Sequence, residues 1–199
     1  ALSNITFGVG NFIYARDNGT FSGNTNNGTD GFEAGNLFDI FQDQTVKAIN
    51  VRLAGGGSGT TVGTEIYARL YSIDPTTGDF VFESESDPFI VASNNLNTNL
   101  VLQLQPAVTM LQNNTYLAVV GSFTTGLRVS NAGTSDPQTS FFYDIPSDTW
   151  FYQTSTPVVR LNFDSSIGLE ENFTNVSCYL APNPTAGESS LTIDSKNLG

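Results

Sequence analysis

The chain has 199 residues, enough for one sizeable hydrophobic core or for one domain with a shorter appendage. Seven Lys and Arg residues stand against nineteen Asp and Glu residues, so the formal net charge is −12. Because such a surface repels nucleic acid and anionic membranes, neither is predicted as a partner. No window approaches the ~18 consecutive apolar residues of a membrane helix, so membrane insertion is not expected.

The composition favours a secreted protein. Only 13% of the residues are charged, and Asn, Thr, Ser and Gly are abundant. The chain opens without a basic and apolar leader, so we interpret Ala1 as a mature N-terminus after removal of a signal peptide. The single cysteine, Cys178, excludes an internal disulfide and a thiolate cluster for a metal ion.

Period-two alternation of apolar and polar residues, without helical periodicity, predicts β-strands along most of the chain. In chain order these strands lie near residues 46–53, 66–71, 80–82, 100–105, 117–119, 141–143, 150–152 and 159–163. The alternation slips at Ala48 and Ile49, which predicts a β-bulge. A proline early and a glycine late in residues 74–79 predict a tight hairpin between two of the strands.

These strands predict an all-β fold with about ten to twelve strands, arranged as an antiparallel jelly-roll-like β-sandwich. We expect this module to occupy residues 1–164. Residues 165–173 are predicted to form a linker, and residues 174–199 a separate segment.

The C-terminal segment carries a distinctive turn. Residues 179–187 read Tyr-Leu-Ala-Pro-Asn-Pro-Thr-Ala-Gly. Pro182 and Pro184 each fix one φ angle, and Asn183 is held extended by the proline that follows it. Gly187 then supplies a permissive turn residue.

Residues 174–199 resemble the opening of the C-terminal sorting domain of the bacterial type IX secretion system. In that family a short strand ends in a Pro-Asn-Pro turn, a glycine follows, and an alternating strand like residues 190–194 comes next. The resemblance implies the first strands of an Ig-like domain, and export through the periplasm and outer membrane to the cell surface or the medium. An ordinary proline turn between two sandwich strands is the alternative.

The resemblance also implies a partner. This segment carries only the first strands of a sorting domain, so an open strand edge is expected. Such an edge pairs readily with another chain, and we expect a component of the secretion machinery or a neighbouring subunit there.

Histidine is absent, which removes the central group of Ser-His-Asp and Cys-His hydrolysis and of histidine-ligated zinc. Paired carboxylates remain, as in glycoside cleavage, and the strand-borne candidates are Glu65, Glu83 and Glu85. Pro88 follows the last of them closely, so we interpret these acids as a solvated strand edge. No catalytic residue is predicted, and the protein is not expected to be an enzyme.

The segment from residue 17 to residue 33 is rich in oxygen ligands. Asp17, Asp30 and Glu33 supply the hard carboxylates that calcium prefers, so they are candidate ligands of a structural calcium ion, the only cofactor the sequence suggests. Asn, Gly and Thr also dominate plain turns, and no ordered Asp-x-Asp-x-Asp-Gly spacing is present. A polar loop without a metal is the alternative.

Two aromatic stripes are candidate ligand-binding residues. Alternation places Trp150 and Tyr152 on one face of their strand, and Tyr67, Arg69 and Tyr71 on one face of another. Sugar-binding modules use planar rings flanked by polar groups, so both stripes are candidates for polysaccharide binding. In the alternative interpretation these rings pack in the core or at a sheet edge.

The sequence therefore favours a secreted, non-enzymatic cell-surface module with a structural or adhesive role. A carbohydrate-binding module is the alternative, and a carboxylate glycosidase is the third interpretation. Exposed aromatic rings beside polar side chains would favour sugar binding, and buried rings would favour the structural role. Two acids facing each other across a cleft would favour the glycosidase.

Overall fold

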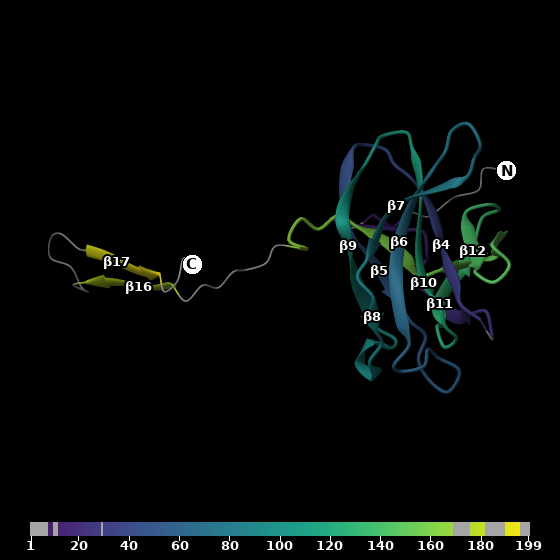
Figure 1. The fold of residues 1–199 in the computed structure, drawn as a ribbon, viewed down its shortest axis with the longest axis horizontal. Helices are drawn as coiled ribbons and strands as arrows, with labels where there is room; N and C mark the ends of the chain where they lie inside the picture. The colour runs from purple at the N-terminus through teal and green to yellow at the C-terminus, as the bar shows by residue number, and fades with distance from the viewer. Residues whose placement is uncertain (1–7, 10–11, 29, 169–175, 182–189, 196–199) are drawn as a thin grey trace. The chain divides into compact units, whose positions relative to one another are not determined.

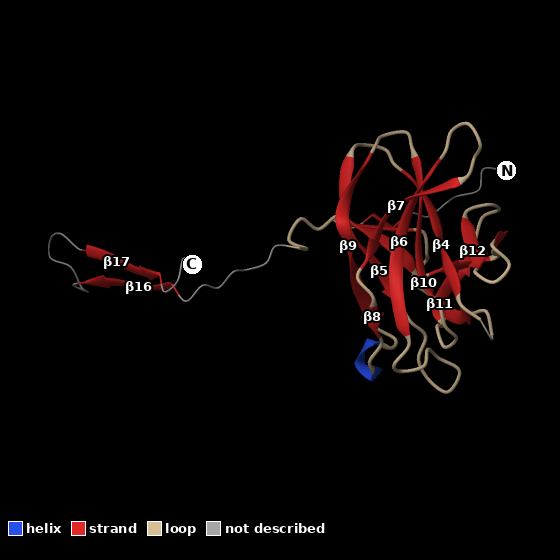
Figure 2. Cartoon of the chain, in the orientation of Figure 1, coloured by secondary structure: helices blue, strands red, loops and turns tan. Residues whose placement is uncertain are grey.

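The computed structural model describes residues 8–9, 12–28, 30–168, 176–181 and 190–195. The chain divides into two compact units, Ala1–Gly168 and Leu169–Gly199, each treated by itself below. The structure confirms the predicted all-β fold, because the strands of the described part pair antiparallel and its one helical element is the short turn η1 (Ser93–Asn95) (Figure 2). No helix in that part is long and apolar enough to span a bilayer.

The larger unit is a β-sandwich whose two layers continue into one another (Figure 1). The first layer runs, in spatial order, through β1 (Gly8–Val9), β2 (Ile13–Ala15), β15 (Val159–Asn162), β5 (Gln44–Arg52) and β9 (Asn99–Met110). The second layer runs through β7 (Phe80–Ser86), β6 (Glu65–Ile73), β10 (Thr115–Ser122), β4 (Phe32–Asp39), β12 (Ser140–Asp144) and β13 (Thr149–Tyr152). The long strand β9 joins them, since it pairs with β5 and, at Leu104 and Gln105, with β7.

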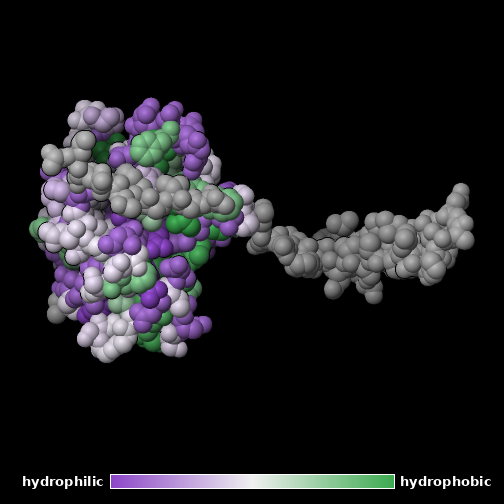
Figure 3. All heavy atoms as spheres, turned by 180° about the vertical axis from the view of Figure 1, so that it is seen from behind, coloured by the Kyte–Doolittle hydropathy of each residue, from purple (hydrophilic) through white to green (hydrophobic). Residues whose placement is uncertain are grey.

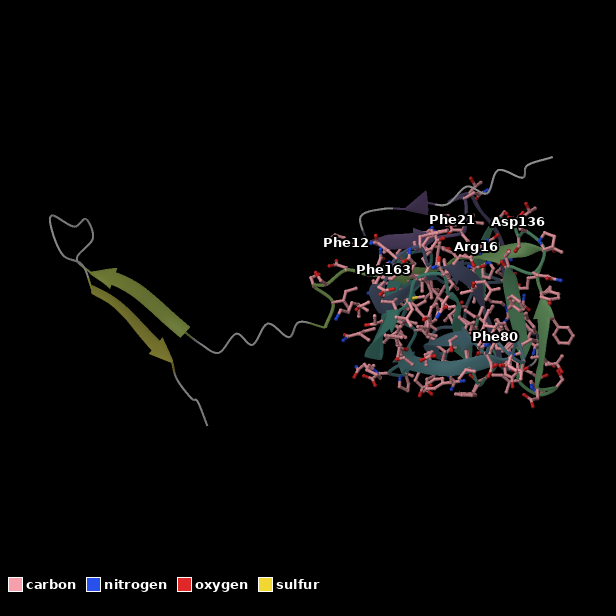
Figure 4. All side chains as sticks on the ribbon, turned by 90° about the horizontal axis from the view of Figure 1, so that it is seen from above. Phe12, Arg16, Phe21, Phe80, Asp136 and Phe163 are labelled. Carbon is pink, nitrogen blue, oxygen red and sulfur yellow. The ribbon has the colours of Figure 1, made fainter. Side chains whose placement is uncertain are left out.

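Three short strands form a separate sheet, in the order β14 (Ser155–Pro157), β11 (Val129–Thr134) and β3 (Phe21–Thr25). One further strand, β8 (Phe89–Ile90), pairs with the start of β6. Figure 3 shows one side of the larger unit, where apolar residues form scattered patches among polar ones. Phe80 of β7 and the pair Phe12 and Phe163 belong to opposite layers (Figure 4).

The main hydrophobic core lies between the two layers. Alternating side chains from both layers meet there, among them Ile49 and Leu161 from the first layer and Leu70 and Val120 from the second, all fully buried. Burial of each such side chain stabilises the fold by roughly 1.5–3 kcal/mol relative to exposure. The core explains the alternation in the sequence, because only every second residue of a half-buried strand faces it.

Of two local predictions, one is corrected and one is confirmed. The pairing of β5 with β9 shifts register between Val46 and Ala48, but the extra residues lie in β9, because Val46 pairs with Val108 and Ala48 with Gln103. The hairpin between β6 and β7 closes where Gly78 adopts a φ of 80° and donates its N–H to the carbonyl of Asp74 at 2.8 Å. The Asp74 carboxylate accepts further backbone N–H groups of the same turn, so short-range chemistry alone builds it.

The smaller unit contains a β-hairpin of β16 (Val176–Ala181) and β17 (Ser190–Ser195). Cys178 pairs with Ile193 and Leu180 with Leu191 in its register. The four residues of the predicted sorting motif, Pro182, Asn183, Pro184 and Gly187, lie outside the described residues.

Candidate functional site

The outer face of the second layer, turned away from the main core, carries the candidate site. Its base is set by β10, where nearly every residue is buried, so this strand is covered on both faces. On the outer face Leu117 and Val119 form a small apolar cluster with Phe141 of β12. This second cluster supports the aromatic rings that pack around it.

Six aromatic rings gather over this base, and we call them the aromatic cluster: Tyr71, Phe80, Phe141, Tyr143, Trp150 and Tyr152. Trp150 is its centre, with ring centroids 4.7 Å from Tyr143, 4.9 Å from Phe80 and 5.9 Å from Tyr71. Most contacts are edge-to-face, an arrangement that contributes about 0.5–1.5 kcal/mol per pair beyond area burial. The rings are therefore held rigidly at the surface.

A groove of about 410 Å³ opens over the aromatic cluster. Phe80, Trp150 and Tyr152 line it, and Asp79 and Gln138 add polar groups. The exposed fraction of Tyr152 is 61%, and Trp150 is half-buried, so both rings face solvent while anchored from below. The volume falls within the range typical of small-ligand sites.

A buried ionic network lies beside the cluster. Glu33 of β4 is fully buried, and its Oε1 accepts hydrogen bonds from Arg69 Nη1 at 2.7 Å and from the Tyr67 hydroxyl at 3.0 Å. Its Oε2 accepts the Tyr71 hydroxyl at 2.8 Å. Arg69 also donates through Nε to Glu85 at 2.9 Å, and its guanidinium lies 4.3 Å from the centre of the Tyr67 ring. We call these five residues the Glu33 network.

Burial raises the pKa of Glu33 above its usual range, whereas the Tyr71 hydrogen bond and the charge of Arg69 oppose that rise. Burial also raises the pKa of Tyr71, and the nearby Glu33 charge adds to this effect, so the phenol stays protonated and continues to donate. The network therefore fixes the Tyr71 ring, which contacts Trp150. Glu33 is thus a structural group beneath the aromatic cluster, bonded to it through the Tyr71 hydroxyl.

The Glu33 network fits because the residue of β10 beside it is a glycine, which has no side chain. Gly121 of β10 faces Glu33, and a Cβ atom there would lie 2.8 Å from Glu33 Cγ and from the ring and hydroxyl of Tyr67. Any larger residue would push both side chains out of place. The glycine is thus required by packing rather than by backbone conformation.

The five residues predicted to bind a ligand fall into two groups. Trp150, Tyr152 and Tyr71 meet in the aromatic cluster. Tyr67 and Arg69 belong to the Glu33 network, and Tyr67 is buried because the exposed ring of Phe123 packs on it at 4.7 Å.

Several members of the site were not predicted in the roles they have, and Phe80 and Glu33 illustrate why. Phe80 joins Trp150 only through the pairing of β7 with β6, and Glu33 meets its partners through the pairing of β4, β10 and β6. For Phe80, its aromatic side chain was the one signal in the sequence. For the role of Glu33 the sequence held no signal, because Tyr67 and Arg69 are more than thirty residues away from it in the chain.

The structure does not bring Asp17, Asp30 and Glu33 together as calcium ligands. Asp17 is buried in a bidentate ion pair with Arg160, at 2.6 and 2.7 Å, and Glu33 is enclosed by its own network. Across the described residues no three or more acidic or cysteine side chains gather as a metal site requires. The carboxylates of Asp17 and Glu33 thus serve the fold.

The strand-borne acids Glu65, Glu83 and Glu85 are exposed, and none of them lines the groove. Glu85 is bound to Arg69. These three residues therefore do not form, in the groove, the pair of facing carboxylates that glycoside cleavage needs.

Comparison with known proteins found no matching family model, no similar curated protein and no similar solved structure. The function is therefore argued from the site itself.

Proposed function

We propose that the larger unit is a non-enzymatic carbohydrate-binding module whose binding surface is the groove over the aromatic cluster. The observation that carries this proposal is the pair of surface rings, Trp150 and Tyr152, anchored from below in a groove with polar groups at its margin. A sugar ring has an apolar face of C–H groups and a rim of hydroxyls. Such a ligand stacks on fixed aromatic side chains and bonds to groups such as Gln138 and Asp79.

A structural or adhesive contact with another protein is the second candidate. Two further phenylalanines are exposed near the aromatic cluster and the Glu33 network: Phe82, next to Tyr71, and Phe123, over Tyr67. Exposed apolar rings mark protein contacts when they form a continuous patch. The two candidates differ in what Trp150 contacts when the protein is bound.

The decisive experiment uses Trp150, which is the only tryptophan of the chain. Its fluorescence and acrylamide quenching are measured with and without cellulose-type glucan, xylan, mannan and β-1,3-glucan, and affinities are measured by calorimetry. We expect one neutral polysaccharide to protect the ring from quenching. Trp150→Ala should lower affinity for that polysaccharide at least tenfold, the loss of roughly 1.4 kcal/mol or more that removal of one stacked ring entails.

Phe151→Ala is the matched control. Phe151 is the next residue of the same strand, is 50% exposed, and pairs with Phe142 on the other side of the sheet. Its truncation should leave affinity within twofold of the wild type. If no polysaccharide binds, or if both variants lose affinity equally, carbohydrate binding through this face is wrong and the protein-contact candidate takes its place.

For the C-terminal unit we propose export by the type IX secretion system, followed by display on the cell surface or release. In the sequence the proline motif of residues 182–187 lies between the paired strands β16 and β17, and this order supports the proposal. The hairpin would meet the secretion machinery or a neighbouring subunit.

Deletion of residues 174–199 tests the export proposal in a host with this secretion system. The truncated protein should accumulate in the periplasm while keeping its polysaccharide affinity. A scrambled tail of the same composition is the matched control. Normal secretion of the truncated and scrambled proteins would refute a sorting role.

A further inference from the structure

A second hollow, of about 370 Å³, shares the exposed Tyr152 side chain with the groove. Its other walls come from β3, β11 and the segment after β13, and they are mostly amide and hydroxyl groups. Asn24, Asn131, Gln153 and Thr154 are among these polar residues. None of the side chains that line this hollow is charged, and Asp79 is the one charged residue in the groove. The two hollows thus differ in character but meet at one ring.

The polar hollow is built around a buried amide. Asn131 of β11 is only 7% exposed, and its Oδ1 accepts a hydrogen bond from the Thr25 hydroxyl at 3.0 Å. The same hydroxyl lies 2.7 Å from Gln153 Oε1, and Gln153 Nε2 donates to the carbonyl of Phe141 at 2.7 Å. The Thr25 hydroxyl has one proton and donates to one of these two oxygens at a time, whereas the bond to Phe141 holds the Gln153 amide in place before any ligand arrives.

The bonding leaves one donor free. Asn131 Oδ1 shares the single Thr25 proton with Gln153 Oε1, which is the nearer oxygen, and Asn131 Nδ2 has no protein acceptor among the described residues. Its hydrogens are not sealed inside the protein either, since this atom is not one of the buried atoms without a partner. A buried amide that lines a hollow with an unused donor is suited to a ligand hydroxyl.

We infer that the groove and the polar hollow form one continuous binding track, crossed at Tyr152, whose ligand is an uncharged linear glycan. This inference rests on the proposed function. Sugar rings stack along the aromatic cluster, and the chain continues past Tyr152 to place hydroxyls on Asn131 and its neighbours. The absence of cationic residues from both sets of walls, with a net charge of −12, disfavours acidic polysaccharides.

The test measures affinity for a short and a long ligand of one series, the trisaccharide and the hexasaccharide of whichever neutral polysaccharide binds. The wild type should bind the hexasaccharide at least tenfold more tightly. Asn131→Ala should reduce hexasaccharide affinity about five- to tenfold, as expected for one or two lost hydrogen bonds, and leave trisaccharide affinity within twofold. Thr25 keeps its bond to Gln153 in this variant, which limits the damage to the fold.

A second variant guards against misfolding of the first. Asn24→Ala combined with Thr154→Ala removes two polar groups that lie nearer the surface of the hollow. It should show the same selective loss for the hexasaccharide. Asn94→Ala, an exposed asparagine in η1 that lines neither hollow, is the matched control and should bind like the wild type.

The outcomes separate the two ideas. If Trp150→Ala weakens both ligands but neither hollow variant weakens the hexasaccharide, the continuous track is wrong and carbohydrate binding by the groove stands. If the wild type binds the trisaccharide and the hexasaccharide with equal affinity, the continuous track is likewise wrong and binding by the groove stands. If the wild type binds no neutral glycan, both the track and the proposed function fail, and tighter binding of alginate or polygalacturonate would overturn the assignment of an uncharged ligand.

Discussion

Two neighbouring regions of one sheet face use aromatic residues in opposite ways. In the aromatic cluster, rings from β6, β7, β12 and β13 rest on an apolar base and leave Tyr152 and part of Trp150 in solvent. In the Glu33 network, two tyrosines turn their hydroxyls inward to a carboxylate that solvent does not reach. Exposed rings are costly in stability and useful for binding, whereas enclosed charges must be satisfied for the fold to persist.

The comparison teaches where to look for function in this fold. Changes in the aromatic cluster should act mainly on binding, and changes in the Glu33 network mainly on stability. Tyr71 connects the two, because its hydroxyl bonds to Glu33 while its ring contacts Trp150. The three predictions below test this division.

The largest expected effect follows from breaking the network at its centre. Glu33→Ala leaves Arg69, Tyr67 and Tyr71 without their shared acceptor, so we expect a loss of about 3 kcal/mol in the free energy of unfolding. This is near the lower end for a broken buried ion pair, because Arg69 keeps Glu85. Urea denaturation measures the loss.

Glu85→Ala is the matched control for that experiment. The Glu85 side chain is 48% exposed, so its bond to Arg69 should contribute less than about 1 kcal/mol. Polysaccharide affinity of either variant should remain within about threefold of the wild type at a temperature where both are folded. A tenfold loss of affinity in Glu33→Ala with no loss of stability would contradict the division.

A smaller effect is expected from crowding the network. Gly121→Ala introduces a Cβ atom 2.8 Å from both Glu33 and Tyr67, and such overpacking costs about 1–3 kcal/mol. Gly57→Ala is the control, because that glycine has ordinary backbone angles and open space around its Cα. Thermal unfolding of the two variants should differ clearly. Equal melting temperatures would show that the network tolerates displacement.

The smallest effect concerns pH. Burial raises the pKa of Glu33 in the folded protein above its value in the unfolded chain, about 4.3. The folded state then binds the proton more tightly, so the contribution of this group to stability is full below the unfolded pKa and declines as pH rises through the folded pKa. Relative to Glu33→Gln, the wild type should therefore lose stability as pH rises above the unfolded pKa of about 4.3.

The measurement is the free energy of unfolding of both proteins, from urea denaturation at several pH values. Subtracting one from the other cancels the contribution of every other titrating group. If the wild type instead gains stability over Glu33→Gln as pH rises, the hydrogen bonds and the charge of Arg69 outweigh the effect of burial on Glu33. In that case the Glu33 network would be an ordinary stabilising ion pair.

Much of the fold follows from local sequence. The strand that became β9 alternates exposed and buried residues from Asn99 to Leu104, as its pattern of leucines predicts. The turn between β6 and β7 was also predicted, because it depends on residues close together in the chain. The face shared by Trp150 and Tyr152 follows from the same period of two.

The composition of the site was decided by tertiary structure. Alternation assigns Tyr71 and Trp150 each to one face of its own strand, but it does not predict that these two faces form one surface. Glu33 looked like a loop ligand for calcium and is instead a strand residue enclosed by groups from β6. Pairing between strands distant in sequence sets these neighbours, and no local pattern encodes the register of such a pairing. The sequence by itself therefore determined the strands and their turns, whereas only the assembled sheet decided which rings stay exposed and which charge is buried.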